Sequence, residues 1–219
     1  RVSSVDVEVR AGEVVGIAGL AGSGRSEILR MIAGVQPRAG GTVTLRGAPL
    51  APRNVRGGHR RGIALVPQER ELFPGMSVED NLVLGAAYIP HAKGIIPEQM
   101  EKVFALFPIL KERRKQLAGT MSGGQQRMVA IARALMSNPK LLILDEPSLG
   151  LQPSIVAEVF EVLRELKKTV SIMVTEQNVR ESLKSIDRGY VLENGKIVIE
   201  DSAEGLRTNP YVLKSYLGI

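Results

Sequence analysis

The stretch from Gly19 to Ser26 reads Gly-Leu-Ala-Gly-Ser-Gly-Arg-Ser and decides the fold of this chain. It follows the apolar run 14–18, which is typical of a buried strand, and it opens the amphipathic run 27–33, which is typical of a helix. Its three glycines permit backbone angles that are closed to other residues, so successive N–H groups can turn toward one point. The free N–H groups of the following helix add a partial positive charge. We therefore expect a phosphate-binding turn.

The spacing matches the P-loop pattern of a glycine, four residues, Gly, Lys and Ser or Thr at every position but one. Ser26 fits the hydroxyl that reaches Mg²⁺ in that pattern. Arg25 stands where lysine is expected, and a broad planar guanidinium is not a conservative replacement for a compact ammonium. We expect Arg25 still to attract phosphate, in an altered geometry. The alternative interpretation is a glycine-rich strand-to-helix turn without a ligand.

Composition excludes several classes of function. The 219 residues are 44% hydrophobic and 24% charged, which is ordinary for a globular protein with one well-packed domain. There is no cysteine, and His59 and His91 are the only histidines, so any bound metal must have oxygen ligands. No apolar run approaches the ~20 residues that span a bilayer, and the start lacks the hydrophobic stretch of a signal peptide. We expect a chain that is neither exported nor membrane-spanning by itself.

The chain carries a formal net charge of +6, with basic groups at 53–61 and 111–115. Such groups can contact nucleic acid or lipid headgroups, but no aromatic residues accompany them here. We therefore interpret them as solvated surface and expect no nucleic-acid partner.

Hydrophobic patterning predicts a mostly parallel central sheet with an antiparallel part. Alternation at 5–9 indicates a half-buried strand, and the region 48–62 has no period and is expected to be an exposed loop. The turn Asn194-Gly195 suits a type I′ hairpin. The other expected elements are a hairpin around 42–47, buried strands at 63–66 and 170–174, a helix at 154–168, a hairpin over 190–198 and two short helices after Ser202.

Residues from roughly 75 to 137 change character and predict a helical lobe inserted between strands. Ser77 opens one helix, and the span 97–107 places Met100, Val103, Phe104 and Phe107 on one face. The run 111–115 is charged and expected to be exposed. We treat 1–219 as a single domain that contains this lobe.

The motif Ser122-Gly123-Gly124-Gln125 begins a long helix with apolar residues at 128, 131, 132 and 135. Ser122 and Gln125 match a capping box, so the motif could simply start a helix. Two glycines in a first helical turn lower helix propensity, which a chain accepts more readily where its backbone must approach something closely. This exposed helix N-terminus is a second candidate anion site.

A buried strand ends in the sequence Leu-Leu-Ile-Leu-Asp-Glu-Pro at 141–147. Asp145 and Glu146 emerge together at its carboxyl end, where burial is costly without a cation or a proton. Asp145 suits Mg²⁺, directly or through water, and Glu146 suits a water to be oriented or deprotonated. The alternative is an ordinary acidic strand end. Gln68 also follows a buried strand, where polar function often sits in α/β sheets, but by itself it is more readily interpreted as a satisfied polar residue. The next buried strand ends in Thr175-Glu176-Gln177-Asn178.

The phosphate loop, the glutamine after a strand, Ser-Gly-Gly-Gln and Leu-Leu-Ile-Leu-Asp-Glu-Pro, in this order, resemble the ATPase domain of an ABC transporter. The resemblance covers nearly the whole chain. Residues from about 1 to 66, with Gly-Arg-Ser in the loop, are similar to the second ATPase domain of ribose-type sugar importers. From Leu72 onward, Phe-Pro-Gly-Met-Ser-Val-Glu-Asp-Asn-Leu, Asp-Glu-Pro-Ser-Leu-Gly-Leu and Asp-Arg-Gly-Tyr-Val-Leu-Glu-Asn-Gly look like the branched-chain amino-acid importer ATPase.

The resemblance implies an α/β P-loop fold and a head-to-tail dimer, homomeric or heteromeric, that binds ATP and Mg²⁺ between subunits. It implies a position on the cytoplasmic face of the cell membrane, where dimer closure pushes on transmembrane permease subunits. It also implies roles for residues of this chain. Nucleotide would contact Gly19, Leu20, Ala21, Gly22, Ser23, Gly24, Arg25, Ser26 and Glu27, and in the partner's site it would contact Ser122, Gly123, Gly124 and Gln125. Mg²⁺ would contact Ser26, Gln68 and Asp145. The catalytic residues would be Glu146, Gln68 and Gln177.

Three positions depart from the family pattern: Arg25 replaces lysine, Gln177 stands where a switch histidine is usual, and Gln152 stands where aspartate is common. The upstream aromatic that usually stacks on adenine is missing, and the start at Arg1 suggests a segment of a longer tandem ATPase. The leading hypothesis is an ATP-hydrolysing importer subunit for branched-chain amino acids or a related solute, which Glu146 favours. The alternatives are a poorly hydrolysing partner domain, which Arg25 and Gln177 favour, and a soluble ABC ATPase that acts on DNA or ribosomes.

Overall fold

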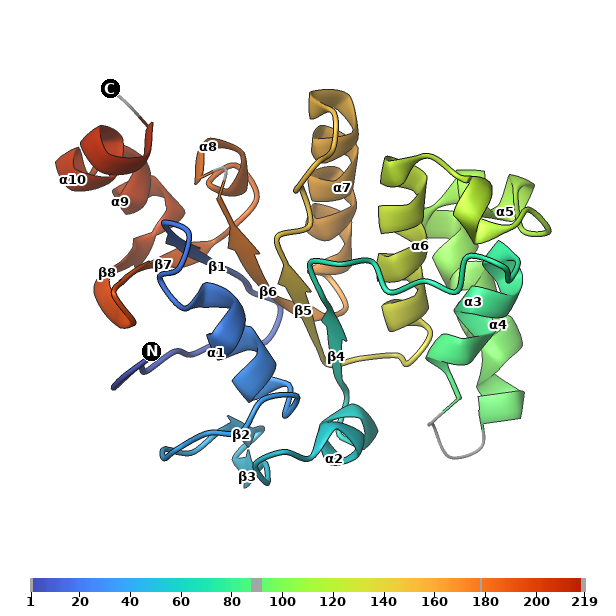
Figure 1. Ribbon diagram of the computed structural model, residues 1–219, viewed down its shortest axis with the longest axis horizontal. Helices are drawn as coiled ribbons and strands as arrows, with labels where there is room; N and C mark the ends of the chain where they lie inside the picture. Colours follow the sequence, from blue (N-terminus) through green and yellow to red (C-terminus); the bar gives the residue numbers. More distant parts are fainter. Residues whose placement is uncertain (1, 88–91, 178, 218–219) are drawn as a thin grey trace.

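The centre of the molecule is a six-stranded sheet with the order β4-β5-β6-β1-β7-β8 (Figure 1). The computed structural model describes residues 2–87, 92–177 and 179–217. Every neighbouring pair of strands is parallel except β7 and β8, which form an antiparallel edge. The predicted α/β class and the mostly parallel sheet are therefore confirmed. The strands are β1 (Val14–Gly19), β4 (Ile63–Val66), β5 (Leu141–Asp145), β6 (Ser171–Glu176), β7 (Arg188–Glu193) and β8 (Lys196–Ser202).

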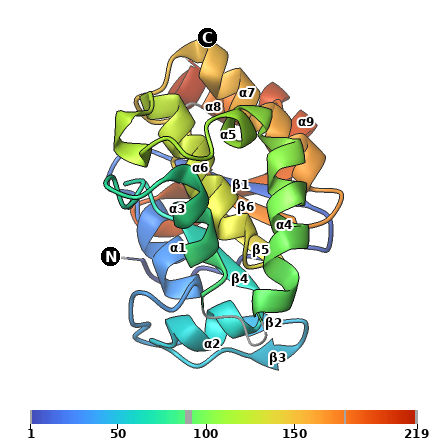
Figure 2. The same ribbon diagram turned by 90° about the vertical axis from the view of Figure 1, so that its right-hand side faces the viewer.

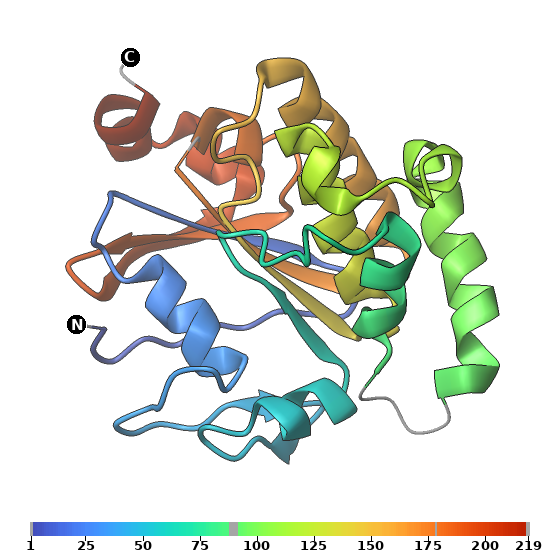
Figure 3. The ribbon, with the colours of Figure 1, turned by 45° about the vertical axis from the view of Figure 1, so that its right-hand side comes forward.

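Helices cover both faces of this sheet (Figure 3). Because successive strand residues point to opposite faces, each buried strand contributes to two apolar clusters. One cluster packs Ile17 and Ile143 against α1 (Arg25–Ile32). The other packs Leu142 and Val174 against α6 (Gly123–Leu135) and α7 (Pro153–Leu166). The loops at the carboxyl ends of β1, β4, β5 and β6 are thus held on a rigid two-sided core.

The predicted helical lobe lies between β4 and β5 in the chain, and its helices gather beside one another in two views (Figures 1 and 2). Ser77 caps α3, since its hydroxyl accepts a hydrogen bond from Asp80 N at 3.1 Å. The four apolar residues expected on one face of the next helix are all buried. The elements are α3 (Val78–Gly85), α4 (Ala92–Leu106), α5 (Pro108–Glu112), the 3₁₀ helix η1 (Ala118–Thr120) and α6.

The last part of the chain follows its predicted pattern closely. Asn194 and Gly195 form the turn of the β7–β8 hairpin with φ values of 49° and 77°, as a type I′ turn requires. Helix α8 (Val179–Ser182) lies between β6 and β7, and the sheet is followed by α9 (Ala203–Thr208), α10 (Pro210–Val212) and the π-helical turn η2 (Leu213–Leu217). Over the described ranges, none of the helices has both the length and the apolar character needed to cross a membrane.

Two expectations about the first third of the chain were wrong. Residues 5–9 form no strand, although their valines pack against the core; instead the backbone of Glu8 bonds to the side chains of Tyr190 and Arg188. The region 48–62 is not a plain loop, because it contains β3 (Ala48–Pro49), which pairs with β2 (Thr44–Leu45), and α2 (Val55–Arg60). The side chain of Asn54 caps α2 by accepting a hydrogen bond from Gly57 N at 2.7 Å, which offsets two glycines in that helix.

Candidate functional site

The glycine-rich turn lies between β1 and α1, where the sequence places it. Gly22 and Gly24 have φ values of 79° and 105°, in the left-handed region that favours glycine. Gly19 has no positive φ, so the prediction that all three glycines supply special backbone angles was wrong for this one. Glycine is required here for a different reason, because a Cβ at this position would collide with the Leu192 carbonyl and the Ser23 hydroxyl. No side chain caps α1, and the N–H groups of its first turn remain available for an anion.

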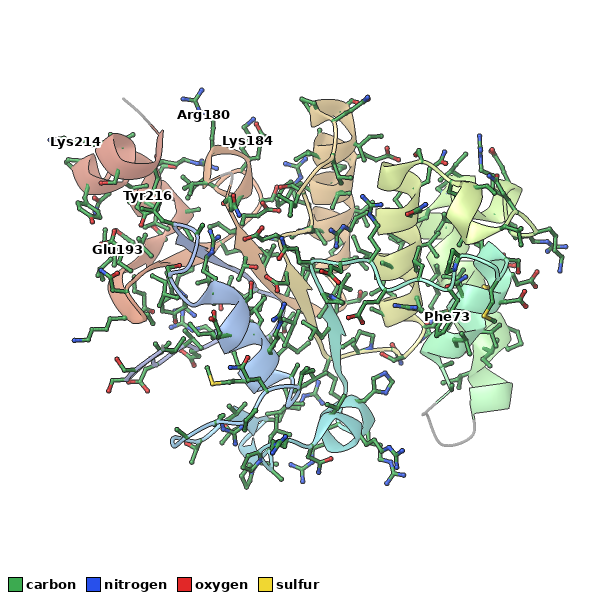
Figure 4. All side chains as sticks on the ribbon, viewed as in Figure 1. Phe73, Arg180, Lys184, Glu193, Lys214 and Tyr216 are labelled. Carbon is green, nitrogen blue, oxygen red and sulfur yellow. The ribbon has the colours of Figure 1, made fainter. Side chains whose placement is uncertain are left out.

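The tip of the β7–β8 hairpin supports this turn from the other side. Gly195 N donates to Ser23 O at 3.0 Å, and Glu193 accepts hydrogen bonds from the hydroxyls of Tyr211 and Tyr216 at 2.5 and 2.9 Å. Figure 4 shows Glu193 and Tyr216 close together at the end of the chain. The phosphate-binding turn is therefore held by segments more than 160 residues later in the sequence.

Arg25 is buried and folded back onto protein oxygens. Its guanidinium donates to the carbonyl of Gly19, to Glu176 O at 2.9 Å and to Glu146 Oε1 at 2.8 Å. Only 4% of the Arg25 side chain and 6% of the Glu146 side chain are exposed. The structure thus joins the residue that replaces the P-loop lysine to the acid expected to act as a base.

Ser26 and Asp145 meet as the sequence predicts. Ser26 Oγ and Thr175 Oγ1 both donate to Asp145 Oδ1 at 2.8 Å. Asp145 is 1% exposed, and its Oδ2 accepts no hydrogen bond from the residues that the structure describes; Arg30 Nη2 lies 3.9 Å from it and forms a long ion pair. A buried carboxylate oxygen without a donor, next to a hydroxyl, suits a hard cation that prefers oxygen ligands.

The residues therefore fit Mg²⁺ bound in the manner usual for nucleotide sites. Mg²⁺ typically takes one or two protein ligands, keeps several waters and binds substrate phosphates. In the described part of the chain, no three His, Cys, Asp or Glu residues gather into a metal cluster, which is consistent with a site of this sparse kind.

Glu146 adopts an unusual backbone conformation at the end of β5. Its φ is 46°, which is uncommon for a residue other than glycine, and its N–H bonds to Thr175 O and Oγ1 at 3.1 Å. The side-chain amide of Gln177 donates to both carboxylate oxygens of Glu146, at 3.1 and 3.0 Å. The structure therefore brings Arg25, Glu146 and Gln177 together.

Gln68 follows β4 at the same edge of the sheet. Its carbonyl and that of Pro67 accept hydrogen bonds from the guanidinium of Arg127 at 2.7 and 3.0 Å. The half-buried side chain of Gln68 lines a cavity of about 520 Å³ together with Arg70, Leu149 and other residues. Within the described residues it makes no hydrogen bond to Ser26 or Asp145, so the structure does not join it to these two residues.

Ser122 and Gln125 form the predicted capping box at the start of α6. Gln125 N donates to Ser122 Oγ at 3.3 Å, and Ser122 N donates to Gln125 Oε1 at 3.1 Å. A Cβ on Gly124 would lie 2.6 Å from Ile155, so packing against α7 accounts for this glycine. Figures 1 and 3 show α6 across the sheet from α1. Within the described segments, the motif at 122–125 therefore does not meet the phosphate-binding turn of the same chain.

Three neighbours of the site were given no role from the sequence: Arg127, and Thr175 and Glu176, which were named only as part of the run 175–178. Thr175 holds Asp145, Arg127 holds the Gln68 loop, and Glu176 accepts hydrogen bonds from Ser148. Burial raises the pKa of Glu176 to about 7; the Ser148 bonds oppose this shift and the charge of Glu146 adds to it. The sequence signal that could have indicated Thr175 and Glu176 was their position at the end of a buried strand.

An uncapped glycine turn, a hydroxyl bonded to a buried aspartate and an adjacent glutamate define a P-loop nucleotide-binding ATPase. The family model described as "ABC transporter" matches residues 2–149, which is more than half of the chain. The chain therefore belongs to the ABC transporter family.

Two relatives show the range of transport within this family. The high-affinity branched-chain amino acid transport ATP-binding protein BraG of Pseudomonas aeruginosa is 46% identical over 98% of this chain and 91% of its own length. The lipopolysaccharide export system ATP-binding protein LptB of Escherichia coli is 31% identical over 99% of this chain and 90% of its own.

Solved structures have the same fold. The ADP conformation of MJ1267, an ATP-binding cassette of an ABC transporter, aligns with a TM-score of 0.84 and 29% identity over 100% of this chain and 92% of that one. A dimeric cassette, MJ0796 bound to ADP and Pi, aligns with a TM-score of 0.79 and 22% identity over 92% and 90%, and supports the fold alone.

Family membership establishes the general activity. ABC ATPases bind ATP, generally with Mg²⁺, couple its hydrolysis to transport and work as dimers with transmembrane permease subunits. This chain is an ABC transporter ATP-binding subunit.

Proposed function

We propose that this chain powers an importer for branched-chain amino acids or a related small solute. The observation that carries the proposal is the 46% identity to BraG along almost the whole of both chains. LptB serves an export system, but its identity to this chain is 31%, so import is favoured over export.

Phosphate binding is assigned to the backbone N–H groups of 22–26 and to Arg25, with Gly19, Leu20, Ala21 and Glu27 lining the site. The uncapped start of α1 and the left-handed Gly22 and Gly24 support this assignment. Mg²⁺ is assigned to Ser26 and Asp145, with Gln68 nearby; when bound, it neutralises phosphate charge. Oδ2 of Asp145, which accepts no hydrogen bond within the described ranges, supports the metal assignment.

Glu146 is assigned as the general base, with Gln177 orienting it. Two contacts restrain this carboxylate in the structure, the ion pair with Arg25 and the amide of Gln177. A guanidinium bonded to the carboxylate competes with water for the same oxygen. Movement of Arg25 would free Oε1 of Glu146 to accept a proton from water, and phosphate is the natural competitor for that guanidinium.

A second ABC ATPase subunit, identical or different, completes the site by supplying its Ser122, Gly123, Gly124 and Gln125. The start of α6 lies across the sheet from the phosphate-binding turn of its own chain, which supports a head-to-tail pairing (Figure 1). Residues 1–219 act as a single nucleotide-binding domain with a helical subdomain over roughly 75–137. The protein works on the cytoplasmic face of the cell membrane.

Permease subunits are assigned to the hollow between the helical lobe and the sheet. A cavity of about 530 Å³ there is lined by α2, α3, α6 and β4 residues, including Val55, Leu84 and Arg133. Phe73 lies at this cavity with 52% of its surface exposed, and its side chain is marked in Figure 4. An exposed aromatic beside an apolar hollow suits a protein partner.

A specific observation favours the second candidate, a nucleotide-binding subunit that hydrolyses ATP poorly at its own site. Arg25 occupies one oxygen of Glu146, and Gln177, which stands where a switch histidine is usual, occupies both. Such a subunit would still contribute Ser122 to a competent partner.

One experiment separates the two candidates and tests the solute. Mg²⁺-dependent ATP turnover is measured for the purified chain alone, with candidate permease subunits, and with added leucine, isoleucine or valine and a binding component. Turnover that rises with these solutes supports the import proposal. Nucleotide binding without turnover in every combination supports the second candidate, and stimulation only by an unrelated solute contradicts the assignment to branched-chain amino acids.

A further inference from the structure

The turn that follows Glu146 leaves one backbone donor without a partner inside the turn. Leu149 N donates to Glu146 O at 3.2 Å and closes the four-residue turn 146–149. Pro147 has no N–H, and the N–H of Ser148 points away from the turn's own hydrogen bond. Its acceptor is Glu176 Oε1, at 2.9 Å.

Glu176 makes a second hydrogen bond to Ser148, through the serine hydroxyl. Glu176 Oε2 accepts from Ser148 Oγ at 2.6 Å, so one carboxylate takes both donors of Ser148. Glu176 ends β6, which lies beside β5, and it is 3% exposed. Because a buried carboxylate is costly unless its oxygens are bonded, this contact is a specific arrangement and not an accident of the surface.

The backbone around Glu176 reaches the other parts of the site. Its carbonyl accepts from Arg25 Nη1 at 2.9 Å, and the next residue, Gln177, bonds the Glu146 carboxylate. Glu146 itself has a φ of 46°, a conformation that a residue other than glycine keeps only where its surroundings enforce it. The bonds from Glu176 to Ser148 act two residues from that strained position.

We propose that Glu176 is a positioning residue for ATP hydrolysis, which fixes the turn 146–149 through Ser148 and thereby sets the direction of the Glu146 carboxylate. This role rests on the proposed function of Glu146 as the base. Glu176 touches neither nucleotide nor water in this role; it acts through the turn.

Charged groups from three elements face Glu176. Glu146 at the end of β5 repels its charge, Arg127 on α6 attracts it, and Arg25 at the start of α1 bonds its carbonyl. Burial raises the pKa of Glu176 to about 7, so its neutral form is accessible near neutral pH. A neutral isostere is therefore a fair substitute, since glutamine can accept from Ser148 N and donate to Ser148 Oγ.

The test compares Glu176→Gln, Glu176→Ala and Ser148→Ala in the full protein. Ser182→Ala is the matched control, because Ser182 is also buried and bonds the carbonyl of Val179, away from the turn. Amide hydrogen exchange of a peptide covering 146–152 reports the turn, and kcat and nucleotide Kd report the reaction.

Glu176→Ala and Ser148→Ala are expected to speed exchange in 146–152 and to lower kcat about tenfold or more with little change in Kd. Combining the two is expected to be no worse than Glu176→Ala alone, because Glu176→Ala already removes both bonds and Ser148→Ala removes only the hydroxyl bond. Glu176→Gln is expected to stay within about threefold of the parent in both measurements, and Ser182→Ala to leave the exchange of 146–152 unchanged.

Unchanged exchange in Glu176→Ala overturns the positioning role, and so does a Glu176→Gln variant as impaired as the alanine variant. A parent protein without turnover counts against the base assigned to Glu146 but leaves the exchange measurement to decide the role of Glu176. If Glu176→Ala does not fold, Glu176→Leu removes both acceptors with less loss of volume, and unchanged exchange in that variant overturns the role equally.

Discussion

Arg25 Nη2 lies 2.8 Å from Glu146 Oε1, and the two side chains form an ion pair that is almost completely buried. Breaking such a pair leaves an uncompensated buried charge, so each residue holds the other in place until a competing charge arrives. We expect phosphate to compete for the guanidinium, which would link nucleotide binding to the release of the glutamate.

Replacing Arg25 with lysine is expected to raise ATP turnover. A compact ammonium fits closely packed phosphates better and cannot form the planar fork that spans Gly19, Glu176 and Glu146. We expect about a tenfold gain in kcat, equivalent to roughly 1.4 kcal/mol of barrier. Steady-state phosphate release measures it, with Arg164→Lys on α7 as the control, since Arg164 pairs with Glu161 away from the site. Equal or lower turnover would contradict this reasoning.

Glu146→Gln is expected to abolish most turnover and to trap an ATP-bound dimer. An amide cannot accept the proton from water, and general-base catalysis contributes about 10²-fold or more. The substitution also removes the negative partner of Arg25, which favours transfer of the guanidinium to phosphate. Size-exclusion chromatography with Mg²⁺-ATP detects the dimer, and unchanged turnover would remove Glu146 from its assigned role.

Ser26→Ala is expected to weaken the effect of Mg²⁺ on nucleotide binding. The hydroxyl that bonds Asp145 Oδ1 would no longer be present as a metal ligand. We expect the Mg²⁺-dependent gain in ATP affinity to fall by about tenfold, or roughly 1.4 kcal/mol. Calorimetric titrations with Mg²⁺ and with a chelator measure the ratio. A Ser26→Ala protein that keeps the full ratio would exclude Ser26 as a ligand.

Glu176 is expected to make the protein less stable as the pH rises. Its pKa is about 7 in the folded state and near 4.5 when unfolded, so between these values the folded state binds the extra proton. Stability from this group is therefore complete at low pH and is lost through about pH 7, by up to about 3 kcal/mol. Urea unfolding of the parent and Glu176→Gln at pH 5 and 8 isolates the effect. The stability of the parent relative to the variant should fall with pH, and a constant difference would argue against a raised pKa.

Ser122→Ala and Ser77→Ala form a matched pair, because each serine caps a helix of the same lobe. Each substitution is expected to lower the free energy of unfolding by about 1 kcal/mol. Only Ser122→Ala is expected to reduce turnover as well, since its motif is assigned to the partner's nucleotide. Equal turnover in both variants would show that the motif at 122–125 only starts a helix and has no role at the partner's nucleotide.

Patterns local to the chain predicted most of the fold. The apolar run 141–144, the Asn194-Gly195 turn and the Ser122 box each carry their structural cause within a few residues. The helix α2 was missed because Gly57 and Gly58 mask a segment that depends on the Asn54 cap.

The partners of the site residues could be predicted only in part. Ser26 and Asp145 were expected to meet, because both were assigned to one metal ion. The contact of Arg25 with Glu146 joins residues 121 positions apart and depends on which rotamer the guanidinium adopts between two strands. The bonds of Glu176 to Ser148 depend in the same way on the neighbouring ends of β5 and β6, which sequence spacing does not specify.

The place of β1 between β6 and β7 has a consequence for synthesis of the protein. During synthesis β1 must wait for partners that leave the ribosome more than 150 residues later, and such long-range pairing is slow. A nascent chain therefore exposes Val14–Gly19 as an unpaired edge and has no formed pocket for ATP. We therefore expect nucleotide to stabilise the protein only after β6 and β7 have been made and paired with β1.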